Sequence, residues 1–197
     1  NFAFIGNHSH SHEYLLEFEF GKFKKDILKS IEIFKNNLGY NPIYFSYPFG
    51  EFSLEHTSFI KKHFKYGFGQ HSGVIDVNKN PYELPRFAMN EKYGDMGRFL
   101  LAVNALPMPI SDLSPKDPVI SINPPSYGFT LSNKIEPKNA IRCFANNGLK
   151  ADTKRLGQNR IEIRLNGPFL KGRGRINCTM AGNKNRWRWL GRQFIVN

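Results

Sequence analysis

The sequence lacks long apolar runs and holds only two cysteines in 197 residues. No uninterrupted apolar stretch approaches the length that a transmembrane helix needs, so no membrane-spanning helix is expected. Neither Cys143 nor Cys178 lies beside a general base, and no redox or catalytic role is indicated for either. With 40% hydrophobic and 14% aromatic residues, the chain is typical of a globular protein with a sizeable core in one or two domains.

Acidic residues are scarce in the C-terminal part. Residues 1–112 hold 12 Lys or Arg and 12 Asp or Glu, whereas residues 113–197 hold 16 and 4. The whole net charge of +12 therefore belongs to the second part. The change falls in a proline-rich stretch, residues 107–118, which is typical of a domain boundary. We predict two domains, over residues 1–112 and 113–197.

Apolar residues in the first part switch between helical spacing and short runs. A stripe at helical spacing runs from Phe23 to Phe34, and Gly39 follows as a stop signal. The patterns predict helices over residues 22–37, 53–64 and 94–106, and strands over residues 2–6, 43–47, 66–70 and 82–90. The third helix is expected to bury Met96, Phe99, Leu100 and Val103. This alternation favours a parallel β/α barrel, whose sites lie at the carboxyl ends of the strands.

The second part consists of short alternating segments separated by turn residues, which favours an antiparallel β-sandwich. Strands are predicted over residues 119–122, 140–144, 160–165, 173–180 and 187–196. Alternation places Ile161 and Ile163 on the core side and the neighbouring arginines on the other. Cys143 and Cys178 also point to the core, where they either bridge the two sheets or remain reduced thiols.

Two tryptophans near the C-terminus, Trp187 and Trp189, share one face of their strand because they are two residues apart. A place in the sandwich core is favoured for them over a carbohydrate-stacking platform. The arginines between and after them would then lie outside and contribute to a basic sheet face. The arginines of that face are Arg160, Arg164, Arg173, Arg175, Arg186, Arg188 and Arg192.

Half of the six histidines lie between Gly6 and His12, directly after the first predicted strand. If residues 8–12 begin a helix, His8 and His12 share one face, because they are four residues apart, and His10 points elsewhere. Paired neutral imidazoles favour zinc or a similar metal. The alternative is a solvated loop or the remnant of a tag. His56 and His63 are expected to face solvent, without a functional role.

Three motifs carry a resemblance to a known family. The sequence reads Gly-Asn-His-Ser-His-Ser-His from Gly6, Tyr-Pro-Phe-Gly from Tyr47 and Leu-Pro-Arg from Leu84. In this order they resemble the polysaccharide deacetylases, metal-dependent enzymes that remove N- or O-acetyl groups from sugar polymers on a distorted (β/α) barrel. The resemblance spans about residues 1–105 and implies a partial barrel of this type. The alternating segments of the second part predict that an immunoglobulin-like β-sandwich follows it.

The resemblance also implies roles for individual residues. His8 and His12 correspond to the histidine ligands of Zn²⁺ or another divalent metal. The backbone N–H of Phe49 would donate to the oxyanion, and Arg86 would orient the catalytic base, since a guanidinium fork suits a carboxylate. His71, at the end of a predicted strand, is the candidate acid for the departing amine.

The sequence departs from the family in two respects. No Asp-Asp pair precedes His8, and the family's late Leu-x-x-x-His motif is missing, since no histidine follows His71. We therefore expect a missing N-terminal segment of the same polypeptide to supply the catalytic Asp. The predicted activity is hydrolysis of amide bonds in an acetylated polysaccharide, in a secreted, periplasmic or cell-envelope protein. Its C-terminal arginines would bind an acidic glycan or an anionic envelope surface. The alternatives are a non-catalytic carbohydrate-binding or structural fragment and, ranked last, a nucleic-acid-binding protein, since the arginines follow no recognised nucleic-acid motif.

Overall fold

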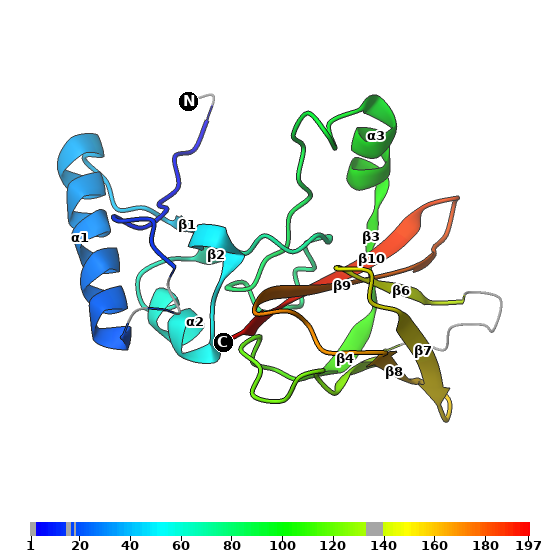
Figure 1. Cartoon of the computed structure of the whole chain (residues 1–197). Helices are drawn as coiled ribbons and strands as arrows, with labels where there is room; N and C mark the ends of the chain where they lie inside the picture. The colour runs from blue at the N-terminus through cyan, green and yellow to red at the C-terminus, as the bar shows by residue number, and fades with distance from the viewer. Residues whose placement is uncertain (1–2, 15–16, 18, 133–139) are drawn as a thin grey trace. The chain divides into compact units, whose positions relative to one another are not determined.

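The computed structural model describes residues 3–14, 17, 19–132 and 140–197 (Figure 1). It is a mixed α/β structure with several sheets, in two compact units. The first unit comprises residues 1–70 and 77–86, and the second comprises residues 71–76 and 87–197. A domain boundary at residue 112 stays a prediction. None of the helices in the described residues has the length and apolar content that crossing a bilayer requires.

The described residues of the first unit form two α-helices and two short strands, labelled in Figure 1. They are α1 (Phe20–Leu38), β1 (Tyr44–Ser46), the 3₁₀ helix η1 (Pro48–Gly50), α2 (Leu54–Ile60) and β2 (Tyr66–Phe68). Helix α1 buries Phe23 and Ile27 and ends at Gly39, whose left-handed backbone lets its N–H donate to the Lys35 carbonyl. Ser53 caps α2 by accepting from the N–H of His56.

Parallel pairing joins four segments of this unit side by side. Asn7 pairs with Phe45 of β1, β1 pairs with β2, and Phe68 of β2 pairs with Leu84. The strand expected over residues 2–6 was wrong, because described residues 3–6 form no strand and the bridge lies at Asn7; Phe2 lies outside the described residues. The strand expected over residues 82–90 is a single bridge at Leu84. Among the described residues this row stays open and forms no closed barrel.

In the second unit, the described residues form one helix and two four-stranded sheets (Figure 1). Its elements are α3 (Met96–Asn104), β3 (Leu106–Pro107), β4 (Ile110–Ser114), β5 (Tyr127–Leu131), β6 (Arg142–Ala145), β7 (Ala151–Leu156), β8 (Arg160–Leu165), β9 (Gly172–Ala181) and β10 (Trp187–Val196). The strand orders are β3-β10-β9-β6 and β4-β5-β8-β7. Buried side chains of both sheets, including Phe129, Ile161, Ile176 and Phe194, form one core.

Several predictions for this unit were wrong. The strand expected over residues 119–122 is a single bridge between Val119 and Ile195, while β4, β5 and β7 were not expected. The apolar residues of α3 do not face a core, because Met96, Phe99, Leu100 and Val103 are all exposed. Periodicity alone identified this helix but could not supply the surface against which it would pack.

The two cysteines form a disulfide, but it does not bridge the sheets. Cys143 of β6 and Cys178 of β9 are register partners on neighbouring strands of one sheet. Both side chains point to the core, as alternation predicts. The disulfide therefore ties strand β6 to the centre of its own sheet.

The faces of β10 are opposite to those predicted. Trp189 pairs with Thr179 and Arg192 pairs with Ile176, so the tryptophans lie on the outer face while Arg188 and Arg192 lie on the inner side. Arg192 is buried, and its guanidinium donates to the carbonyls of Pro115 and Lys116. These carbonyls compensate the burial of a charged group that would otherwise be costly.

We expect replacement of both cysteines by alanine to lower the free energy of unfolding of the chain by about 3–4 kcal/mol, because the disulfide closes a long loop in the unfolded chain. The sequence separation of Cys143 and Cys178 is 35 residues. Urea unfolding with and without reductant measures the effect. Reductant should destabilise the wild type by a similar amount and leave the double variant unchanged. Equal midpoints for the oxidised wild type and the double variant would contradict the assignment.

Candidate metal and catalytic site

The candidate site lies in the first unit, at one edge of the parallel row that Asn7, β1, β2 and Leu84 form. The carboxyl ends of neighbouring parallel strands meet at the same edge of a sheet. His8 follows Asn7, Pro48 follows β1 by two residues, and Arg86 follows Leu84 by two residues. Pairing thus delivers three separate sequence motifs to one edge.

Asn7 anchors the histidine loop, residues 8–12, to β1. Its N–H donates to the Tyr44 carbonyl at 2.8 Å, and its carbonyl accepts from the N–H of Ser46 at 2.9 Å. The buried side-chain oxygen accepts from the Ser30 hydroxyl at 3.0 Å and from the N–H of Ser9 at 3.0 Å. A side chain bonded to both α1 and the loop fixes the point from which the histidines extend.

The imidazole of His8 is oriented by the neighbouring strand. Its Nδ1 lies 2.7 Å from the carbonyl oxygen of Ser46, the last residue of β1. A carbonyl can only accept a hydrogen bond, so Nδ1 carries the proton in the neutral ring. The proton-free Nε2 is then available to a metal, an arrangement common among metal-binding histidines.

Residues 8–12 do not form the helix on which the pairing of His8 and His12 was predicted. Ser9 and His12 have positive φ values of 65° and 57°, so the chain makes a tight left-handed turn. The Ser9 hydroxyl accepts from the N–H of His12 at 3.1 Å. This turn still brings the two rings together, with centroids 4.8 Å apart.

Asp26 of α1 holds the middle of the loop. Its two carboxylate oxygens accept from the N–H groups of His10 and Ser11, each at 3.0 Å. Sequence reasoning missed this residue, because a solvent-side carboxylate on a helix carries no signal of a partner fifteen residues earlier.

The arrangement fits part of a metal site. Two imidazoles with adjacent rings, one of them held in the tautomer that frees Nε2, supply two nitrogen ligands. A catalytic zinc commonly has three protein ligands. Within the part of the chain that the structure describes, no group of three or more His, Cys, Asp or Glu residues is placed to hold a metal. The described residues thus supply a histidine pair without a third ligand.

The turn after β1 carries the predicted oxyanion donor. Phe49 has a left-handed backbone with φ 56°, and its ring lies 4.9 Å from that of His12. Tyr14 stacks on Phe49 with centroids 4.1 Å apart. Tyr47, just before the turn, is fully buried; desolvation and then the nearby Glu83 raise the pKa of its phenol well above the usual value. Tyr47 therefore stays protonated, and its ring packs in the hydrophobic core of the first unit.

The other two predicted residues are placed differently. Arg86 is exposed, at the carboxyl end of the segment that pairs with β2. His71 is buried and belongs to the segment of residues 71–76 in the second unit.

His56, expected to face solvent, is buried instead, with its Nδ1 2.6 Å from the Ser53 hydroxyl. A further buried carboxylate that sequence reasoning missed, Glu51, follows the turn directly.

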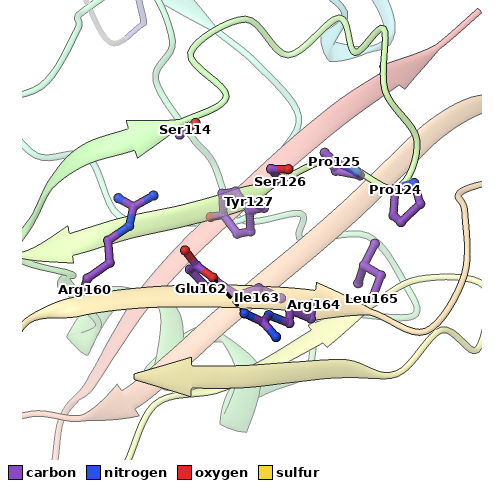
Figure 2. Close-up of a pocket in the computed structure, with 10 residues that line it drawn as sticks. All are labelled: Ser114, Pro124, Pro125, Ser126, Tyr127, Arg160, Glu162, Ile163, Arg164 and Leu165. Carbon is purple, nitrogen blue, oxygen red and sulfur yellow. Dashed lines mark hydrogen bonds and ion pairs between the residues drawn. The ribbon is translucent and has the colours of Figure 1, made fainter. Parts of the chain in front are cut away.

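The predicted basic sheet face is divided between two sheets. Arg160 and Arg164 project from β8, whereas Arg173 and Arg175 belong to β9 in the other sheet. A hollow of about 500 Å³ lies beside β8. Figure 2 shows its lining residues, with Arg160 toward one end and Pro124 and Leu165 toward the other. Arg164 forms an ion pair with Glu162 at 3.4 Å, which leaves this surface only moderately basic.

Histidines at the carboxyl edge of parallel strands are typical of metal-dependent enzymes. Residues 3–66, about a third of the chain, match the family model of polysaccharide deacetylase. The match covers the histidine loop, α1, β1, the Tyr47–Gly50 turn and α2. It confirms the resemblance over this segment and associates it with hydrolases that deacetylate polysaccharides. None of the curated proteins matches the chain.

We expect Gly50→Ala to destabilise the chain more than Gly39→Ala. Both glycines have positive φ, 69° and 77°, so alanine is strained at either by about 1–2 kcal/mol. A Cβ at Gly50 would also lie 2.5 Å from the backbone N of Gln70, whereas nothing lies within 4 Å at Gly39. Urea unfolding should therefore show a loss at least 1 kcal/mol larger for Gly50→Ala, about the cost of a small overpacking. Equal losses would show that the turn does not pack against Gln70.

Proposed function

We propose that this chain is part of a metal-dependent polysaccharide deacetylase that hydrolyses the amide bonds of acetylated amino sugars. The observation that carries the proposal is the His8 and His12 pair at the carboxyl edge of the parallel row, inside the segment that matches the family. We propose that residues 1–112 belong to a partial, distorted barrel and that residues 113–197 form an immunoglobulin-like sandwich beside it in the sequence.

His8 and His12 would hold the metal, which we take to be Zn²⁺. Such a metal, when bound, acidifies a water and polarises the acetyl carbonyl. The hydrogen bond from His8 Nδ1 to the Ser46 carbonyl supports this role, because it fixes the ring and makes Nε2 the donor atom. A carboxylate from a preceding segment of the same polypeptide would complete the ligand set.

The remaining groups would act on the substrate. The hydrolysis adds water to the acetyl carbonyl, breaks the C–N bond, and releases acetate and an amine that takes up a proton. The backbone N–H of Phe49 would donate to the carbonyl oxygen as it gains negative charge. Arg86, exposed at the same edge as His8, would orient the carboxylate base through a forked contact. His71 would give the amine its proton.

The second unit would attach the enzyme to its polymer or to the envelope. Sixteen basic and four acidic residues in 113–197 attract acidic glycans or an anionic envelope surface. Arg160 and Arg164, beside the hollow of Figure 2, are suited to forked contacts with carboxylates or phosphates. Such binding should weaken as salt is added. This function favours a secreted, periplasmic or cell-envelope location.

A second candidate function is a non-catalytic carbohydrate-binding or structural role. It is favoured by the absence, among the residues described, of any cluster of three metal-ligating side chains. The test uses the chain extended by the preceding segment that would supply the carboxylate ligand, called the carboxylate segment. Release of acetate by this extended chain supports the enzyme, and its absence supports the non-catalytic role.

Metal titration tests the proposed ligand pair. We expect His8→Ala and His12→Ala each to weaken zinc binding by about tenfold or more, because each removes a ligand. His10→Ala is the matched control, since its backbone N–H bonds to Asp26 but its ring is assigned no role. Binding should be weak in the chain alone, where the third ligand is missing. Equal affinity in all three variants would remove the proposed site.

Acetate release from an acetylated amino-sugar oligomer tests the role of Arg86. In the chain extended by its carboxylate segment, Arg86→Ala should lower kcat/KM by about 100-fold, roughly 2.7 kcal/mol of transition-state stabilisation. Arg86→Lys should restore little, because lysine lacks the forked geometry. His71→Ala should lower the rate less, since water can replace a proton donor, and His63→Ala, at an exposed position, should have no effect. An unchanged rate for Arg86→Ala would reject its role.

A further inference from the structure

A second concave surface lies in the second unit, on the outer face of the sheet β3-β10-β9-β6. It is a cleft of about 250 Å³. Its lining residues are Leu101, Phe144, Asn177, Thr179, Trp187 and Trp189. All six are uncharged, although this part of the chain is strongly basic.

Aromatic rings dominate the cleft and are open to solvent. Trp187 is 48% exposed and Phe144 is 60% exposed, which is unusual for large apolar side chains in a well-formed sheet. They come from β10 and β6, on either side of β9. Exposed rings grouped around a hollow are typical of a binding surface.

Trp189 forms a fixed floor for the cleft. Its Nε1 donates to the side-chain oxygen of Asn177 at 3.3 Å. Phe87 packs edge-on against its ring, with centroids 5.4 Å apart, and the Arg98 guanidinium lies 5.2 Å from its centroid. With the ring held from several directions, little conformational entropy remains to be lost on binding.

The distance between the two sides of the cleft, Phe144 on β6 and the tryptophans on β10, is also fixed. Phe144 pairs with Asn177, next to the pair Cys143 and Cys178, so the disulfide holds the Phe144 wall against β9. At Gly191, the partner of Asn177 on the other side, a Cβ would lie only 2.0 Å from the Ser72 carbonyl oxygen, so the backbone of Ser72 covers β10 there. The cleft is preorganised by covalent and backbone constraints.

We propose that this cleft binds an acetylated sugar ring of the polysaccharide. The apolar C–H face of a pyranose stacks on Trp187, and its hydroxyl and acetamido groups bond to Asn177 and Thr179, the polar residues of β9 in the cleft. A second copy of this chain is the less suitable occupant, because a stable dimer buries about 800 Å² on each partner, far more than six residues provide.

The charge of this part of the chain selects between the two forms of the sugar. An acetylated amino sugar is neutral, whereas the deacetylated sugar carries an ammonium group. Sixteen basic against four acidic residues in 113–197 repel that cation, and Arg142 pairs with Thr179 at the margin of the cleft. The cleft therefore retains the acetylated substrate and releases the deacetylated product. This selection rests on the proposed function.

Tryptophan fluorescence of the full chain tests the inference directly, because the only two tryptophans in the sequence both line the cleft. The probes are an N-acetylated amino-sugar oligomer and the same oligomer after complete deacetylation, at a pH where the amine is protonated. The acetylated oligomer should change the fluorescence saturably. Trp187→Ala should weaken its binding by about tenfold or more. Leu170→Ala, which removes an exposed side chain outside the cleft, is the matched control and should bind as the wild type does.

Three binding results would overturn the inference. They are the absence of a fluorescence response to the acetylated oligomer, wild-type affinity in Trp187→Ala, and equal binding of the two oligomers. Sedimentation that depends on concentration, and that Trp187→Ala abolishes, would identify a second copy as the occupant and also overturn it. Because binding is read without turnover, a chain that carries the preceding carboxylate segment and binds the oligomer but releases no acetate rejects only the proposed function. An active enzyme that gives no response rejects only the cleft.

Discussion

The site depends on parallel pairing between segments that are far apart in the sequence. Asn7, β1, β2 and Leu84 lie side by side, and their carboxyl ends carry the histidine loop, the Tyr47–Gly50 turn and Arg86. The same pairing places the Ser46 carbonyl 2.7 Å from His8 Nδ1. One backbone interaction therefore both positions the loop and selects the tautomer that a metal requires.

The histidine pair shows how far sequence reasoning reaches. Helical spacing and the family resemblance predicted that His8 and His12 would lie together, and their rings are adjacent. The predicted cause was wrong, because the loop is a left-handed turn fixed by Ser9 and by the carboxylate of Asp26. Helical spacing is a local property, whereas this turn depends on a long-range contact with α1 that no local pattern contains.

The second unit shows the same limit for strands. Strands β8 and β10 have the predicted bounds, since alternation is local and strong in both. Alternation divides β10 into two sets of side chains but does not say which set is buried. Pairing with β9 decides this, because Cys178 and Ile176 face the core and carry Arg192 inward with them. The burial of an arginine in preference to a tryptophan depends on the carbonyls of Pro115 and Lys116, which only the folded chain brings within reach.

The X-ray absorption spectrum of the chain loaded with zinc reports the atoms bound to the metal, so it tests directly whether His8 and His12 are its ligands. We expect two imidazole nitrogens at about 2.0–2.1 Å from the metal in the wild type, one in His12→Ala, and two in His10→Ala. Bound zinc with no imidazole ligand, or with the same imidazole count in the wild type and His12→Ala, would contradict the metal site proposed for His8 and His12.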